Sequence, residues 1–153
     1  TFGGVAVTAE IIDNDGKTDS QNEYGDSLDV GFTYIVEDAI APEVIEDDDV
    51  LDIVFANGDP NSTITIAFTE TLDDEDEGWY AQDLIVKNDE GKTLKAGTDY
   101  TTAVDDNDAT KLVVTIKGVT NLNNYSIQSK ASIEYIADEK GNTAKPFTKR
   151  VKN

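Results

Sequence analysis

Acidic side chains gather at the bends of this chain, and carboxylate oxygens are the ligands that hard divalent cations prefer. Asp13, Asp15 and Asp19 lie in one polar segment between two runs of alternating apolar residues. Ca²⁺ takes about six to eight oxygen ligands, and a loop with acids at alternate positions supplies several of them. The EF-hand pattern is not met, because Ile11 or Lys17 falls on a ligand position. We therefore expect a calcium site of another type here, with a solvated acidic hairpin tip as the alternative.

Two further acidic groups are candidate calcium ligands. Asp105, Asp106 and Asp108 lie together between two apolar segments, and Glu37 and Asp38 precede a proline-containing joint. Carboxylates on both sides of a joint can share one ion and stiffen it, by analogy with other strings of immunoglobulin-like modules. Aspartate is also an ordinary turn residue, so a turn without an ion is the alternative for Asp105, Asp106 and Asp108. The sequence thus predicts Ca²⁺ as the cofactor of these groups.

The overall composition excludes several classes of function. Thirty-two Asp and Glu against 12 Lys and Arg give a net charge of −20, which repels nucleic acid and anionic lipid. The chain has no His and no Cys, so it lacks the commonest catalytic bases and nucleophiles, and we expect no enzymatic activity. No segment approaches the roughly 18 apolar residues that a membrane-spanning helix needs, so we expect no direct membrane insertion.

The charge is also unevenly distributed along the chain. Residues 1–108 carry 29 acids and 4 bases, whereas residues 109–153 carry 3 acids and 8 bases. The basic C-terminal stretch is therefore expected to meet the acidic part of a neighbouring domain or subunit, through a contact that salt weakens.

Short alternating runs rich in Val, Ile, Thr and Tyr, separated by Gly, Pro, Asn and Asp, predict an all-β fold. Residues 42–153 are expected to form a complete immunoglobulin-like β-sandwich of about seven strands. The expected strands are 50–56, 62–69, 80–87, 98–104, 111–117, 124–136 and 146–151. Residues 1–41 are expected to contain a β-hairpin and a linker. Because a lone hairpin is marginally stable, we interpret it as the last strands of a preceding immunoglobulin-like domain in a longer protein.

Four motifs in residues 42–153 and their boundary occur in the order seen in one protein family. They are Asp38-Ala39-Ile40-Ala41-Pro42, Thr65-Ile66-Ala67-Phe68, Gly97–Thr101 followed by Lys111–Ile116, and Asn124–Ile127 followed by Asp138–Asn142. With this set the chain resembles the immunoglobulin-like domains of Gram-positive bacterial surface-layer (S-layer) proteins. The resemblance implies a secreted structural protein of the cell wall surface that assembles into a lattice, often with Ca²⁺. It implies other copies of the chain and neighbouring immunoglobulin-like domains as partners.

Two other functions remain open at this point. An adhesin stalk or carbohydrate-binding module would present an exposed aromatic platform near Trp79, Tyr80 or Tyr100. Alternatively, the acidity would serve only to keep the domain solvated, with no response to a specific ion. Adding Ca²⁺ or a sugar separates these hypotheses from the lattice module.

Overall fold

The structure is a computed structural model and describes residues 38–153, which form one compact unit. A hairpin is expected within residues 1–41, and residues 1–37 of that segment lie outside the described residues. The described chain begins with an extended segment, residues 38–45, which we call the entry segment. It then forms a small hairpin of β1 (Glu46–Asp47) and β2 (Val50–Leu51). Both central residues of its turn, Asp48 and Asp49, have positive φ angles of 48° and 65°. Positive φ angles at both central residues give the turn a twist that matches the right-handed twist of the two strands.

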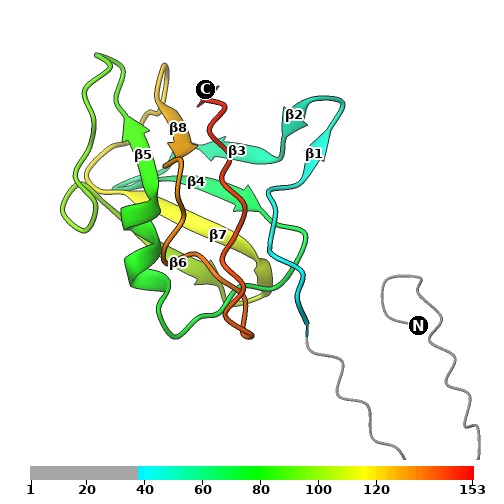
Figure 1. The fold of residues 1–153 in the computed structure, drawn as a ribbon. Helices are drawn as coiled ribbons and strands as arrows, with labels where there is room; N and C mark the ends of the chain where they lie inside the picture. Colours follow the sequence, from blue (N-terminus) through cyan, green and yellow to red (C-terminus); the bar gives the residue numbers. More distant parts are fainter. Residues whose placement is uncertain (1–37) are drawn as a thin grey trace, which may run out of the picture. The chain divides into compact units, whose positions relative to one another are not determined.

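The larger sheet has four antiparallel strands in the spatial order β3-β4-β7-β6 (Figure 1). Its strands are β3 (Ile53–Ala56), β4 (Ser62–Ala67), β6 (Tyr100–Asp105) and β7 (Asp108–Ile116). Alternate residues of β4 and β7 are fully buried, as in Ile64, Ile66, Leu112 and Val114. This two-residue period places one face of the sheet in the core and the other toward solvent.

A smaller antiparallel sheet, in the order β5-β8-β9, contributes the rest of the core. Its strands are β5 (Leu84–Lys87), β8 (Ser126–Ser129) and β9 (Val151–Lys152). Val86 and Ile127 are completely buried and belong to the same apolar cluster as the inner residues of the larger sheet. Three antiparallel sheets, counting the β1–β2 hairpin, confirm the all-β class for the described residues.

Three of the expected strands are much shorter in the structure, and the expected strand 50–56 is split at Asp52 into β2 and β3. Of the expected strand 146–151, only Val151 lies in a strand, β9. The first half of 80–87 belongs to the 3₁₀ helix η1 (Glu77–Asp83), because Tyr80 is fully buried and its hydroxyl donates to the carbonyl oxygens of Asp73 and Ala137, at 2.5 and 3.2 Å. The segment 124–136 leaves the sheet after Ser129, where backbone N–H groups turn to the side chain of Asp83 instead of a neighbouring strand. Long-range side-chain contacts thus override local strand propensity in these last two segments.

Candidate metal centre

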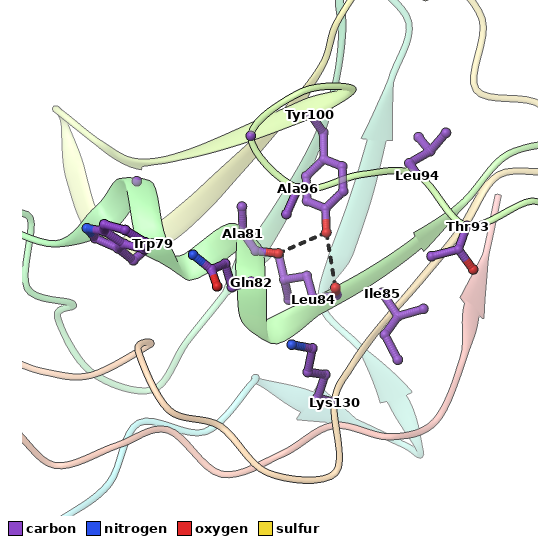
Figure 2. Close-up of a pocket in the computed structure, with 12 residues that line it drawn as sticks. Trp79, Ala81, Gln82, Leu84, Ile85, Thr93, Leu94, Ala96, Tyr100 and Lys130 are labelled. Atoms are coloured by element: carbon purple, nitrogen blue, oxygen red, sulfur yellow. Dashed lines mark hydrogen bonds between the residues drawn. The ribbon is translucent and has the colours of Figure 1, made fainter.

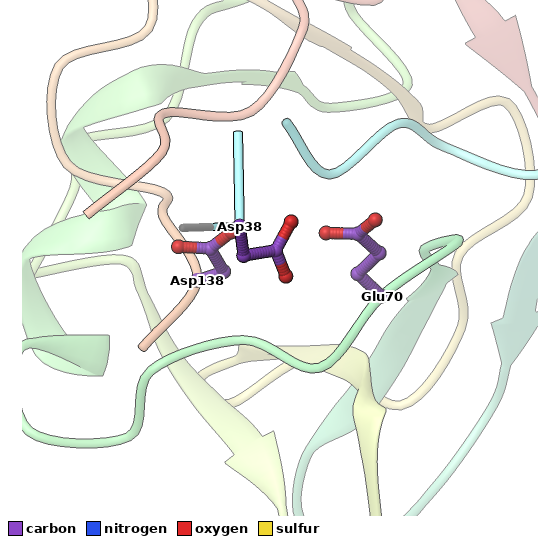
Figure 3. A group of neighbouring side chains, drawn as sticks. All are labelled: Asp38, Glu70 and Asp138. Atoms are coloured by element: carbon purple, nitrogen blue, oxygen red, sulfur yellow. The ribbon is translucent and has the colours of Figure 1, made fainter. Parts of the chain in front are cut away.

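Three carboxylates from distant parts of the chain converge at one edge of the domain (Figure 3). Asp38, Glu70 and Asp138 each offer an oxygen, and these oxygens lie within 4.8 Å of one another. Within residues 38–153 this is the one group of three or more potential metal ligands that approach so closely. The site is therefore defined by tertiary contacts between positions that are far apart in sequence.

The backbone around Asp38 and Glu70 is held in place by a short antiparallel contact. Val44 and Phe68 form a β-bridge, the N–H of Thr69 donates to the carbonyl oxygen of Glu43 at 2.8 Å, and the N–H of Glu43 donates to the Thr69 hydroxyl oxygen at 3.1 Å. Phe68 is buried in the core, so the residues that follow it have little freedom. This contact brings the entry segment of the domain alongside the end of β4.

Asp138 organises the third part of the site. Its side chain is 5% exposed and accepts hydrogen bonds from the N–H groups of Lys140 and Asn142, at 2.8 and 2.9 Å. The Asn142 amide Nδ2 also donates to Asp138, at 2.8 Å. Burial by itself raises the pKa of Asp138, but these hydrogen bonds stabilise the charged form and bring the net pKa below its ordinary value. Asp138 is therefore ionised at neutral pH.

Asn142 connects Asp138 to the entry segment. Its Nδ2 donates to the carbonyl oxygen of Asp38 at 3.0 Å, in addition to its bond with the Asp138 carboxylate. The Asp38 carboxylate accepts the N–H of Ile40 at 3.1 Å, which gives the entry segment a local turn. One amide side chain thus fixes the distance between two of the three acidic residues.

The convergence of the three carboxylates changes the pKa of Glu70. Its pKa is raised, first by burial and then by the negative charges of Asp38 and Asp138. Three like charges at this distance repel one another, and a divalent cation at their centre would replace the repulsion with attraction. Carboxylate oxygens, with backbone carbonyls and water, form the ligand set that Ca²⁺ prefers. The arrangement therefore fits a hard, oxygen-bound cation.

Of the sequence-predicted ligands, Asp38 is the one that the structure places in this cluster. Asp13, Asp15, Asp19 and Glu37 lie outside the described residues. The predictions on those four residues remain predictions.

The β6–β7 turn, by contrast, does not bring Asp105, Asp106 and Asp108 together as a group of three close ligands. The Asp108 carboxylate contacts Lys111 Nζ at 2.7 Å and accepts the Thr110 hydroxyl at 2.6 Å, and these contacts lower its pKa to about 2. Asp105 accepts the N–H of Asn107 at 2.8 Å. In the structure, Asp105 and Asp108 therefore hold the turn together through its own residues.

Glu70 and Asp138 were not predicted as ligands from the sequence. Asp138 belongs to the Asp138–Asn142 motif, whose residue types predict a turn and which contributes to the family resemblance. Glu70 follows a strand as a single acid, without the clustering that drew attention to the other sites. No local pattern connects the two residues with Asp38, so only their positions in the folded chain show that the three belong together.

A second candidate surface lies beside η1 (Figure 2). It is an open pocket of about 710 Å³ lined by Trp79, Gln82, Ile85, Leu94 and Lys130 among others. Trp79 is 54% exposed, and its ring stacks on Tyr135 with centroids 6.0 Å apart. Trp79 is thus available at the surface, contrary to the core position that most tryptophans adopt.

The other two aromatic residues of the predicted platform are structural. Tyr80 and Tyr100 are buried, and the Tyr100 hydroxyl lies 2.8 and 3.0 Å from the carbonyl oxygens of Ala81 and Leu84 (Figure 2). Burial raises the pKa of each phenol to about 12. Of the three aromatic residues considered, Trp79 is therefore the one that can meet a ligand.

No protein-family model matches the chain, and no curated protein matches it in sequence. Within the described residues, no helix has the length and apolar character needed to cross a membrane.

Proposed function

We propose that this chain is a structural module of a bacterial surface-layer protein. In this proposal residues 42–153 form an immunoglobulin-like sandwich, and bound Ca²⁺ stabilises its contacts with neighbouring domains or subunits in an extracellular lattice. The observation that carries the proposal is the convergence of Asp38, Glu70 and Asp138. Asp38 is the first residue of the compact unit Asp38–Asn153, so an ion bound there would tie the start of this unit to Glu70 and Asp138.

The contacts of the entry segment support a mechanical role. The N–H of Lys145 donates to the carbonyl oxygen of Pro42 at 2.8 Å, and Lys145 forms an ion pair with Glu43. The segment is thus fastened to the C-terminal part of the domain as well as to the end of β4. A cation bound by Asp38 would add one more attachment at the start of the same segment. A module whose first residues are fastened to the rest of the domain suits the role of a spacer in an array.

The net charge supports a role for cations in assembly. A chain of −20 repels further copies of itself, and this repulsion grows as the copies approach. Divalent ions at clustered carboxylates reduce the charge where it is densest. Compaction and association are therefore expected to depend on Ca²⁺ more strongly than on an equal ionic strength of NaCl.

A thermal melt tests the calcium proposal on the full chain. Extracellular calcium modules bind with dissociation constants of about 0.1–1 mM, so about 5 mM Ca²⁺ is a suitable concentration. At about ten times the dissociation constant, binding contributes about 1.4 kcal/mol, which raises the melting temperature by about 3–6 °C. The gain should exceed that in NaCl of equal ionic strength.

The variant Glu70→Gln tests whether the ion binds at this cluster. Without calcium it should melt slightly above the wild type at pH 7, because a repelled negative charge has been removed, and it should lose the gain with Ca²⁺. Asp89→Asn removes one exposed acid outside the cluster and is the matched control, expected to keep the full gain. A calcium gain of the same size in Glu70→Gln would refute this site.

The exposure of Trp79 supports a second candidate function, that of a carbohydrate-binding module. A half-exposed indole beside the amide of Gln82 and the ammonium of Lys130 offers a stacking surface and polar groups to a sugar. Trp79 is the only tryptophan in the chain, so its fluorescence reports on this pocket alone. Titration with soluble cell-wall oligosaccharides should shift that fluorescence with or without Ca²⁺. An unchanged spectrum at millimolar sugar would exclude this candidate.

A further inference from the structure

The pocket beside η1 has a lining that differs in charge from the rest of the chain. Asp and Glu make up 32 of the 153 residues, yet none of the twelve described residues that line this pocket is acidic. Gly78, Thr93 and Gly97 of the lining are exposed, so the lack of acids is not confined to the buried floor. The one charged side chain in the lining is that of Lys130 (Figure 2). A negatively charged group of a ligand would therefore meet a cation and no acid in this lining.

Lys130 is held beside the pocket by its backbone. Its N–H donates to the carbonyl oxygen of Asp83 at 2.7 Å, and its carbonyl oxygen accepts the Ser129 hydroxyl at 2.8 Å. The ion pairs formed within residues 38–153 involve other lysines. No carboxylate of the described residues therefore neutralises the exposed Lys130 ammonium, which can pair with an anionic group of a ligand.

A second ammonium lies at the rim of the pocket. Lys117 Nζ donates to the carbonyl oxygen of Gly97 at 3.0 Å, and Gly97 belongs to the lining. The nearest acid in this loop is Asp99, whose carboxylate accepts the N–H of Lys95 at 2.8 Å. The rim thus carries positive charge at two places, and the Asp99 carboxylate is directed to the backbone of its own turn.

The acids of η1 are likewise bonded to groups outside the lining. The Glu77 carboxylate accepts the N–H of Val104 at 2.6 Å, and the Asp83 carboxylate accepts the N–H groups of residues 134–136. Asp76 and Glu134 are exposed to solvent and do not line the pocket. The chain therefore has acids around this pocket but keeps them out of its surface.

The floor of the pocket is apolar. Ala81, Leu84 and Tyr100 are at most 4% exposed, and the Tyr100 hydroxyl already bonds with the carbonyl oxygens of the other two. At one side Trp79 presents its indole, which Tyr135 covers on one face by stacking. An apolar floor, one exposed aromatic ring and a few polar groups are typical of a small-molecule site.

We propose that this pocket binds a sugar that carries a carboxylate. The apolar face of the sugar ring would stack on Trp79, and its carboxylate would accept a hydrogen bond from Lys130 Nζ. The net charge of −20 does not prevent this, because charges more than about 8 Å away are largely screened at physiological ionic strength. This inference rests on the second candidate function, the carbohydrate-binding module, and names its ligand class. It is independent of the lattice proposal.

Trp79 fluorescence tests the inference with two forms of one sugar. The full chain is titrated with trigalacturonic acid and with its methyl ester, which has the same rings without the negative charges. A calcium chelator is present, so that a metal ion cannot bridge the carboxylates to the protein. The acid should bind more tightly than the ester. Lys130→Met should raise the dissociation constant of the acid about three- to tenfold and leave that of the ester unchanged.

Lys140→Met is the matched control, because it removes the same charge at an exposed lysine that does not line the pocket. It should keep the preference for the acid, and a melt of each variant verifies that it is folded. Equal affinity for acid and ester, or an equal loss in both variants, would overturn the inference and leave the carbohydrate-binding candidate standing. Absence of binding of either form at millimolar concentration would overturn both. Binding of the acid only when Ca²⁺ is added would overturn the role of Lys130.

Discussion

At the scale of single residues, buried carboxylates in this domain serve as acceptors for backbone N–H groups. Asp83 is 1% exposed and accepts the N–H groups of Glu134, Tyr135 and Ile136 at 3.1, 2.7 and 2.9 Å. Such charge-assisted bonds compensate the loss of hydration of the carboxylate and replace the ladder that this segment lacks. Acidity in this chain is therefore partly structural, and not only a surface property.

Replacing Asp83 with Asn tests this role. The Asn amide nitrogen would face N–H groups that need an acceptor, so Asp83→Asn should lower the free energy of unfolding by about 2–4 kcal/mol. Urea denaturation monitored by Trp79 fluorescence measures the change. Asp89→Asn, at an exposed turn, should change stability by less than about 0.5 kcal/mol. Equal stability of the two variants would show that the Asp83 bonds contribute little.

The pair of Asp108 and Lys111 gives a pH-dependent prediction. The hydrogen bond from Lys111 is the largest cause of the lowered pKa of Asp108, at about 2 against an ordinary 3.8. A lowered carboxyl pKa means that the folded state favours the ionised form. Its contribution to stability is complete above pH 3.8 and is lost as the pH falls through about 2.

A carboxyl ¹³C NMR titration of Asp108 measures that pKa directly. Lys111→Met should move the Asp108 midpoint upward toward 3.8, whereas Lys92→Met, in another turn, should leave it near 2. Because Asp108 is exposed, the accompanying change in stability should be small. A midpoint near 3.8 already in the wild type would contradict the ion pair.

At the scale of elements, the two edges of the four-stranded sheet are treated differently. The carboxylate of Glu77 in η1 accepts the N–H of Val104 at 2.6 Å, and the Thr102 hydroxyl donates to the carbonyl oxygen of Glu77, also at 2.6 Å. The helix therefore blocks part of the β6 edge from pairing with another strand. The opposite edge strand, β3, carries exposed Val54.

The β1–β2 turn places two aspartates where glycine or asparagine is preferred. Asp48 and Asp49 both have positive φ angles, a conformation that is strained for most side chains. Asp49→Gly should therefore raise the free energy of unfolding by up to about 1 kcal/mol. Chemical denaturation measures it. Asp47→Gly, in β1, should be destabilising by a similar amount, because a strand gains nothing from glycine flexibility. Destabilisation by both variants would show that the Asp49 side chain itself is needed.

At the scale of the whole molecule, basic residues near the C-terminus pair with acidic residues of the same domain. Lys145 pairs with Glu43, and Lys149 lies 3.9 Å from Glu46 and also donates to the carbonyl oxygen of Asp49. The C-terminal basic stretch is expected to meet acidic residues of a neighbour, and in the structure Lys145 and Lys149 meet residues 43–49 of their own domain. Contact with another domain or subunit stays a prediction for the remaining charges.

The net charge predicts how the whole chain responds to salt. At −20, repulsion among acids outweighs the few ion pairs, so screening should stabilise the folded state. Raising NaCl from about 20 mM to about 500 mM should increase the melting temperature by about 3–8 °C in the absence of Ca²⁺. Differential scanning calorimetry measures this shift. A fall in melting temperature would mean that attractive pairs such as Lys145–Glu43 dominate the electrostatics.

Local sequence patterns were sufficient to predict the all-β class and the positions of most strands. Alternation of apolar residues acts within a few neighbours, as in Ile64 and Ile66 of β4, so each strand carries its own signal. The expectation of an oxygen-bound cation likewise rests on composition alone, and it stays a prediction. Prediction of strands failed at 80–83, 130–136 and 146–150. At the first two places a buried tyrosine and a buried aspartate made contacts that no local pattern contains.

Tertiary structure alone decided which acids meet and which strands lie side by side. Asp38, Glu70 and Asp138 come from three segments joined by backbone bonds and by Asn142, and clustering in sequence pointed to other aspartates. The order of the strands β3-β4-β7-β6 likewise depends on long-range pairing, because β4 lies beside β7 although η1, β5 and β6 separate them in sequence. Both features arise from pairing between distant segments, whose geometry depends on the packing of the whole core and not on the order of neighbouring residues.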